Sequence, residues 1–192
     1  MSEYQYYEFL AVDRPLDDGQ MREVRDVSNR AAITPTSFFN EYSWGDFKGN
    51  PDEWMMKYFD AFLNCANWGT QRFMLRFPKR YFDADAARKY CIGDSAFLKT
   101  RGDHVILSFE ANYDDDDWIE AEGWLALMIP LRSEIISGDL RCLYLAWLLC
   151  VQNEAVDDDE VEPCVPANLK ELSASESSFA DFFNSTTPDR VS

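Results

Sequence analysis

Alternating hydrophobic and polar residues predict several strands in this chain of 192 residues. In one of them, Phe73, Leu75 and Phe77 would point to the core. The alternate residues Arg72, Met74 and Arg76 would point to solvent, because successive side chains of a strand point to opposite faces of its sheet. The predicted strands cover residues 4–12, 37–44 and 71–77, and the two arms of a hairpin, 95–100 and 104–111.

Hydrophobic residues spaced three or four positions apart predict helices between these strands. Asn50 can cap a helix that starts at Pro51, since proline lacks the amide that would otherwise be unpaired at this position. The stretch around Trp147 is apolar on almost every side, which is typical of a helix at the centre of a core. The predicted helices cover residues 17–30, 51–67, 130–138 and 139–152.

The order of these elements predicts an α+β fold. A β-α-β-α-β opening is followed by the hairpin, and we expect a small mixed or antiparallel sheet covered by helices. We expect a single α+β domain over residues 1–153 and an acidic linker over residues 154–166. An amphipathic helix with a frayed tail would form residues 167–192.

Charge adds an asymmetry that the pattern alone does not show. The net charge is −17, from 35 acidic and 18 basic residues. Residues 1–100 carry 15 acidic and 13 basic side chains, a net of −2, whereas residues 101–192 carry 20 acidic and 5 basic, a net of −15. Such a surface repels phosphate and anionic lipid and attracts basic proteins. We therefore expect a basic protein partner or a larger protein assembly, no direct nucleic acid binding and no membrane association.

Two dense acidic segments are the candidate interaction site. They lie within residues 114–122 and 154–162, where the sequence places no lysine or arginine beside them. Exposed charge of this kind would steer a basic partner during encounter. The candidate residues are Asp114, Asp115, Asp116, Asp117, Glu120, Glu122, Asp157, Asp158, Asp159 and Glu160.

The first acidic segment also raises the possibility of calcium binding. A calcium loop of the EF-hand kind needs glycine at its sixth position and glutamate at its twelfth. Counted from Asp114, these positions hold Ile119 and Leu125, so the pattern fails. We therefore interpret the segment as a solvated acidic loop.

Glu41, Asp46 and Lys48 are the best catalytic group that the sequence offers. The tripeptide Asp46-Phe47-Lys48 fits the (D/E)-x-K pattern of metal-dependent nucleases, in which carboxylates hold Mg²⁺ and the lysine stabilises developing charge. Here the tripeptide lies between two glycines, where a loop is expected, and the net negative charge of the protein would repel a nucleic acid substrate. A metal-dependent enzyme therefore stays an alternative.

Other catalytic chemistry is sparse. His104 is the only histidine, and we expect it at the surface beside the hairpin turn. The sequence has no G-x-S-x-G elbow, no glycine-rich phosphate loop and no clustered Cys and His for zinc. The five cysteines have no C-x-x-C spacing, and we expect all of them to be reduced. We therefore expect no cofactor and favour a non-enzymatic protein, with the metal-dependent enzyme as the alternative.

One basic cluster lies in and just after the predicted strand at 71–77. It could bind an anionic partner, or it could pair with the acidic second half of the same molecule, which we favour. Its members are Arg72, Arg76, Lys79, Arg80, Arg88 and Lys89.

The termini and apolar runs bear on localisation. The longest apolar run, residues 143–151, is shorter than the roughly 20 residues that cross a bilayer. The first residues, Met1 to Tyr4, lack the basic start and apolar stretch of a secretory signal. We expect a soluble, cytoplasmic protein.

Several phrases resemble those of a group of bacterial proteins of unknown function, and the likeness extends to about residue 170. The resemblance implies a bacterial cytoplasmic protein and assigns neither an activity nor a site residue. The phrases are Tyr4-Gln5-Tyr6-Tyr7-Glu8-Phe9-Leu10-Ala11, Ile33-Thr34-Pro35-Thr36, Trp44-Gly45-Asp46-Phe47-Lys48-Gly49, Ala66-Asn67-Trp68-Gly69-Thr70, Gly93-Asp94-Ser95, Gly102-Asp103-His104 and Gly123-Trp124-Leu125.

Three functional hypotheses follow from the sequence. We favour a non-enzymatic interaction or regulatory module that offers an acidic face to a basic protein, for which nucleic-acid-binding proteins are natural candidates. The second hypothesis is an accessory subunit that uses its aromatic surface in a larger bacterial assembly. The third is the metal-dependent enzyme.

Overall fold

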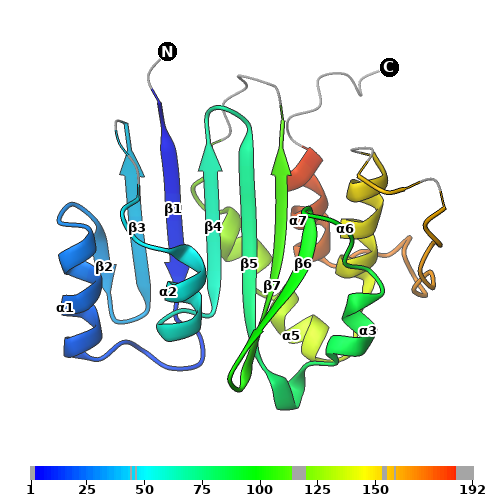
Figure 1. Cartoon of the computed structure of the whole chain (residues 1–192), viewed down its shortest axis with the longest axis horizontal. Coiled ribbons are helices and arrows are strands. Elements are labelled where there is room, and N and C mark those ends of the chain that lie inside the picture. The colour runs from blue at the N-terminus through cyan, green and yellow to red at the C-terminus, as the bar shows by residue number, and fades with distance from the viewer. Residues whose placement is uncertain are drawn as a thin grey trace.

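Helices lie on both faces of one sheet in the structure, a computed structural model that describes residues 3–43, 45, 47–113, 120–152, 155–157 and 159–184 (Figure 1). Within these residues the sheet has seven strands in the order β2-β3-β1-β4-β5-β7-β6, and every neighbouring pair is antiparallel. The α+β prediction is therefore confirmed, with an antiparallel sheet that is larger than expected. The elements are β1 (Gln5–Leu10), α1 (Asp18–Val27), β2 (Ala32–Thr34), β3 (Ser37–Tyr42), α2 (Pro51–Lys57), β4 (Ala61–Ala66), β5 (Thr70–Pro78), the 3₁₀ helix η1 (Lys79–Tyr81), α3 (Ala84–Arg88), β6 (Ala96–Arg101), β7 (His104–Asn112), α4 (Trp124–Met128), α5 (Leu131–Ile136), α6 (Arg141–Gln152) and α7 (Ala174–Asn184).

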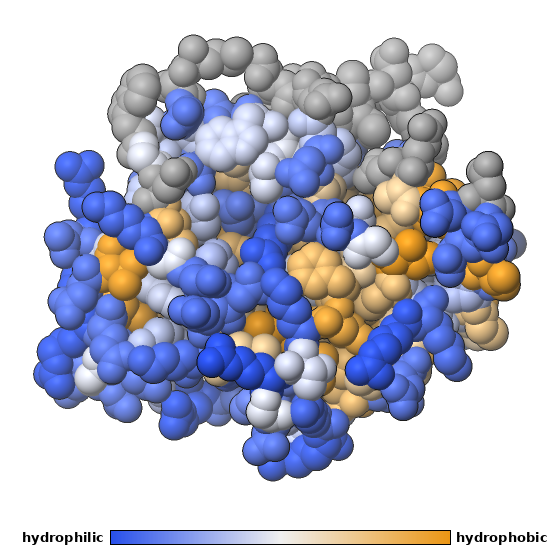
Figure 2. All heavy atoms as spheres, in the orientation of Figure 1, coloured by the Kyte–Doolittle hydropathy of each residue, from blue (hydrophilic) through white to orange (hydrophobic). Residues whose placement is uncertain are grey.

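Helices α1 and α2 lie against one face of the sheet (Figure 1). The Asp17 carboxylate accepts from the amide of Gln20 at 2.8 Å and caps α1. The Asn50 side chain accepts from the amide of Glu53 at 3.2 Å and caps α2, which Pro51 opens as predicted. Figure 2 shows this side of the molecule, where hydrophilic residues dominate over α1 and apolar surface gathers over β6.

The predicted helix over residues 51–67 is wrong in its second half. Helix α2 ends at Lys57, and after a turn the chain continues as β4. The amide of Asp60 donates to the carbonyl of Leu10 at 2.8 Å, which fastens this turn to the end of β1. Residues 61–65 of β4 are all buried. Because a strand that is buried on both faces has no polar alternation, periodicity alone cannot distinguish it from a helix.

The opening of the chain also contains one strand more than predicted between its two helices. Helix α1 ends at Val27, short of the expected residue 30, and the three-residue strand β2 forms a hairpin with β3. A strand of three residues is too short to show a pattern of its own. Strand β1 lies between β3 and β4, with Phe9 opposite Phe38 on one side and Phe62 on the other.

Both faces of the central strands are buried, which corrects one expectation for β5. Phe73, Leu75 and Phe77 point to the layer of α4–α7, as predicted. Met74 was expected to face solvent but is fully buried, together with Ile106, beneath α2. The predicted hairpin of β6 and β7 is confirmed, and its inward-facing residues join the same two cores.

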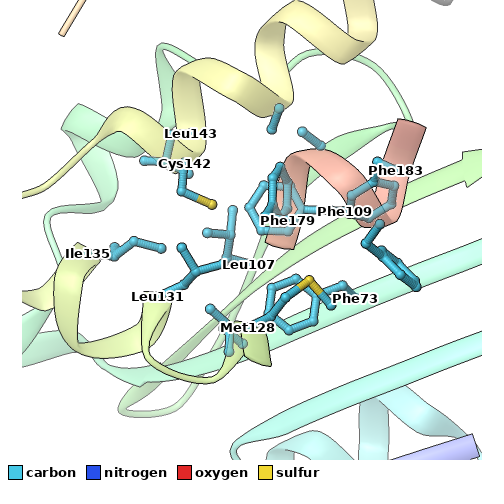
Figure 3. Close-up of a cluster of buried hydrophobic side chains, with 14 of the residues drawn as sticks. Phe73, Leu107, Phe109, Met128, Leu131, Ile135, Cys142, Leu143, Phe179 and Phe183 are labelled. Atoms are coloured by element: carbon cyan, nitrogen blue, oxygen red, sulfur yellow. The ribbon is translucent and has the colours of Figure 1, made fainter. Parts of the chain in front are cut away.

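Helices α4–α7 cover the other face of the sheet, and Figure 3 shows where their side chains meet those of β5 and β7. Phe109 packs on Phe179 of α7 with ring centroids 4.9 Å apart. Trp147 of α6 is 7% exposed and stacks on Tyr144, as expected for a central helix. The labelled members of the cluster are Phe73, Leu107, Phe109, Met128, Leu131, Ile135, Cys142, Leu143, Phe179 and Phe183.

Hydrogen bonds and an ion pair at its first turn cap helix α7 and hold it against α6. Ser173 accepts from the amide of Glu176 at 3.1 Å, and the Glu176 carboxylate accepts from the amide of Ser173 at 2.7 Å. Arg141 of α6 forms an ion pair with Glu176 at 3.1 Å. These contacts and the buried aromatic residues of α7 make this C-terminal helix part of the main core.

Candidate interaction surface

The structure describes half of the predicted acidic site. Glu120, Glu122, Asp157, Asp159 and Glu160 are all exposed. None of them forms an ion pair with another residue in the described part of the chain. The other predicted members, Asp114 to Asp117 and Asp158, lie outside the described residues.

A second acidic surface lies on the sheet itself. Helices α4–α7 stand behind β4, β5, β7 and β6, whereas no helix of the described chain stands behind β1 and β3 (Figure 1). This face of β1 and β3 is called the open face below. Its residues are the buried Tyr6, the partly buried Glu8 and Leu10 from β1, and the partly buried Ser37 and Phe39 and the exposed Glu41 from β3.

Glu8 lies at the centre of the open face. Its cross-strand neighbours are Phe39 on β3 and Leu63 on β4, so apolar side chains flank the carboxylate on both sides. The Tyr6 hydroxyl donates to this carboxylate at 2.8 Å. Burial raises the pKa of Glu8, the hydrogen bond from Tyr6 offsets part of this rise, and the charge of Glu122 adds to it. Among the described residues, no lysine or arginine forms an ion pair with Glu8.

Aromatic residues and further carboxylates surround Glu8. The Tyr6 ring packs on Phe39 with centroids 5.2 Å apart. Burial raises the pKa of Tyr4, and so does its hydrogen bond to the exposed Glu41. The charge of Glu122, in the first acidic segment, also raises the pKa of both Tyr4 and Tyr6. The open face is therefore acidic at its centre and its rim.

A charged cleft of about 610 Å³ lies on the opposite face, beside α2. The Arg72 guanidinium is 3.2 Å from Asp52 and 3.4 Å from Glu110, and the Lys99 ammonium is 2.9 Å from Asp52. Burial would raise the pKa of Asp52, but the hydrogen bond from Lys99 and the charge of Arg72 outweigh it and lower that pKa. Two cations and two carboxylates pair with one another here, and this network links α2, β5, β6 and β7.

The basic cluster pairs mainly within the first half of the chain, contrary to expectation. Arg76 pairs with Asp60 at 2.6 Å, and Arg88 pairs with Asp85 at 2.6 Å. Of the ion pairs in the described part of the cluster, only that of Arg72 with Glu110 reaches the second half. Most of the described carboxylates in residues 101–192 therefore form no ion pair with this basic cluster.

His104 shows no catalytic environment. It is the first residue of β7 and is partly exposed. Burial and the nearby charge of Arg76 lower the pKa of His104. Within the described chain its ring has no hydrogen-bond partner, so it lacks the orienting carboxylate that a histidine base uses.

The trio considered for metal chemistry is not assembled by the described residues. Glu41 lies on the open face, and Asp46 is outside the described residues. Phe47, between Asp46 and Lys48, packs against Phe9 on the opposite side of the sheet, with centroids 5.9 Å apart. Within the described residues, no group of three His, Cys, Asp or Glu side chains is placed to hold a metal.

Comparisons with family models, curated proteins and solved structures give no match. In the described residues, no helix is both long enough and apolar enough to cross a membrane.

The sequence reasoning missed Glu8 and Asp60. Glu8 interrupts an otherwise aromatic and apolar face of its strand, Tyr4-Tyr6-Leu10, and this break in the pattern was the available signal. Asp60 had been placed within a predicted helix, where a carboxylate is ordinary.

Proposed function

We propose that this protein is a non-enzymatic interaction or regulatory module that binds a basic protein through its acidic surface. The proposal rests on the exposure and the lack of ion pairs of five described carboxylates in the second half of the chain, Glu120, Glu122, Asp157, Asp159 and Glu160. They are exposed and have no ion-pair partner among the described residues. Proteins with basic patches, such as nucleic-acid-binding proteins, carry the complementary charge.

Charge in these segments would act mainly on the rate of encounter. Clefts and surfaces of one sign raise association rates by roughly 10- to 1,000-fold at low salt. The effect fades as the Debye length falls from about 10 Å at 0.1 M salt to about 3 Å at 1 M. The proposal therefore predicts a partner whose association is fast and sensitive to salt.

The test begins with capture of partners from the native host at low and moderate salt, followed by association kinetics with the purified partner. The neutralised variant replaces Asp114–Asp117 and Asp157–Asp159 with asparagine. It should associate about 10-fold more slowly at low salt, and the difference should disappear near 1 M salt. A control variant with Asp26→Asn and Glu53→Gln removes exposed charge from the first half and should behave like the wild type. An unchanged rate and salt dependence for the neutralised variant would contradict the proposal.

An accessory role in a larger assembly is the second candidate, and an apolar surface around α6 favours it. Leu148 and Val151 of α6 are 40% and 43% exposed, and Val161 and Val165 in the following segment are 81% and 52% exposed. On the side shown in Figure 2, apolar surface extends from β6 toward α6. A partner held by this surface would stay bound at high salt and would be lost on Leu148→Ser with Val151→Ser.

A further inference from the structure

Glu8 differs from the buried carboxylates of Asp60 and Glu176 in the group that compensates its charge. Asp60 and Glu176, which are 0% and 1% exposed, each form an ion pair with an arginine, at 2.6 Å and 3.1 Å. Glu8 is also partly buried, yet its hydrogen-bond partner is the Tyr6 hydroxyl and no described cation pairs with it. A desolvated carboxylate without a cation destabilises a fold. A neutral residue at this position would make the fold more stable.

The surroundings of Glu8 match the composition of binding hot spots. Tyr6 and Phe39 supply packed aromatic rings, and Glu41 adds an exposed carboxylate on the same face. The charge of Glu122 also acts on Glu8. Hot spots favour aromatic and arginine residues, and arginine both pairs with carboxylates in a bidentate manner and stacks on aromatic rings.

We infer that the open face is the docking surface for the basic partner, and that an arginine of that partner pairs with Glu8 against the partly exposed ring of Phe39. The inference rests on the proposed function and adds the place of contact. Glu41 and Glu122 at the rim complement further basic residues of the same segment. The acidic loops speed the encounter, whereas the open face holds the bound partner.

Because the loops and the open face have different roles, substitutions in them should affect binding in different ways. Removing rim or loop charge changes the association rate and its salt dependence. Removing one member of a desolvated charge pair changes the dissociation rate, and it weakens binding by about 10-fold or more even at high salt. Glu8→Gln keeps the acceptor for Tyr6 and removes only the charge, so it isolates the second effect.

The binding test uses an octa-arginine peptide as the probe, measured by titration calorimetry at low and high salt. The wild type should bind, Glu8→Gln should bind at least about 10-fold more weakly at both salt concentrations, and the shifted amide signals in NMR spectra should map to residues 5–10 and 37–42. Glu53→Gln, the same change on an exposed residue of α2, is the matched control and should bind like the wild type. If the wild type does not bind the peptide, the proposed function fails. If it binds and only the neutralised loops weaken it, the proposed function stands and the open face is overturned.

A second measurement is independent of any partner. Because burial raises the pKa of Glu8, the charged carboxylate destabilises the native state at pH 7. This loss of folding free energy develops as the pH rises through the folded-state pKa. Glu8→Gln should therefore unfold at a higher temperature than the wild type at pH 7, and the difference should vanish at a pH below the pKa of the unfolded chain. The titratable groups around Glu8 are Tyr6, which donates to it, Cys65 and Glu122, which interact with its charge, and Glu41, which lies across from Tyr6 on the same face. A lower unfolding temperature would show that the fold needs this carboxylate, and would overturn the inference.

Discussion

Replacing Asp60 with alanine tests the main polar anchor of this fold. The Asp60 carboxylate is 0% exposed and accepts from the amides of Val12 and Asp13 at 2.7 Å and 2.9 Å. It also accepts from the Arg76 guanidinium at 2.6 Å and 3.0 Å. One side chain therefore fastens the end of β1, the turn before β4 and the strand β5 to one another.

The magnitude follows from what the deletion leaves behind. Each buried donor without an acceptor costs about 1–3 kcal/mol, and breaking a buried ion pair by removing one member costs about 3–5 kcal/mol. These costs overlap, because Arg76 retains the Met56 carbonyl at 3.1 Å and its side chain is 12% exposed. We expect Asp60→Ala to lower the free energy of unfolding by about 3–5 kcal/mol, a large share of the 5–15 kcal/mol typical of a domain.

Urea unfolding followed by circular dichroism measures this loss. Asp85→Ala is the matched control, because Asp85 also lies 2.6 Å from an arginine, Arg88, but these side chains are 91% and 58% exposed. The control should cost less than about 1 kcal/mol. Asp60→Ala combined with Arg76→Met should cost less than the sum of the single changes by about 1–3 kcal/mol. A loss below about 1 kcal/mol for Asp60→Ala, or strictly additive changes, would refute the reasoning.

Three further predictions concern packing, a turn and the thiols. Trp147→Ala should lower the free energy of unfolding by about 3–5 kcal/mol. Trp147→Phe should lower it less, because the buried indole N–H has no acceptor in the described structure. The urea midpoints of the two variants and the wild type measure both losses. Gly69→Ala should lower the melting temperature, since Gly69 has φ +92° and an added Cβ would lie 1.9 Å from the Tyr113 carbonyl oxygen; an unchanged melt would contradict this. Alkylation with mass spectrometry should find all five cysteines free, the exposed Cys164 reacting first and Cys142, whose pKa burial raises, reacting only on unfolding; an intrachain bridge would disprove this.

Local signals in the sequence were sufficient wherever neighbours along the chain decide the structure. Asn50 caps its helix as predicted, since a cap depends on residues within one turn. The hairpin of β6 and β7 was also predictable, because its turn and its alternation lie within one short segment. The helix around Trp147 followed from its continuous apolar surface.

Predictions failed where burial on a second face decided the structure. The sequence pattern predicts the end of a helix where strand β4 forms, because β4 is covered on both sides and so lacks alternation. Met74 was assigned to the surface because the sequence does not reveal that α2 returns over β5. The partners of Arg76 and Arg88 were misplaced for a related reason, since overall charge does not determine which carboxylate lies within reach.

The sequence by itself determined the class of the fold, the individual caps and most strands, and the concentration of negative charge in the second half. Periodicity, capping chemistry and charge are properties of local segments and are readable without a fold. Only the tertiary structure decided the strand order, the carboxylate of Asp60 as an anchor, and the position of the partly buried Glu8 on a sheet face behind which no described helix stands. These features depend on which segments meet across the sheet, and long-range packing rather than local pattern determines that choice.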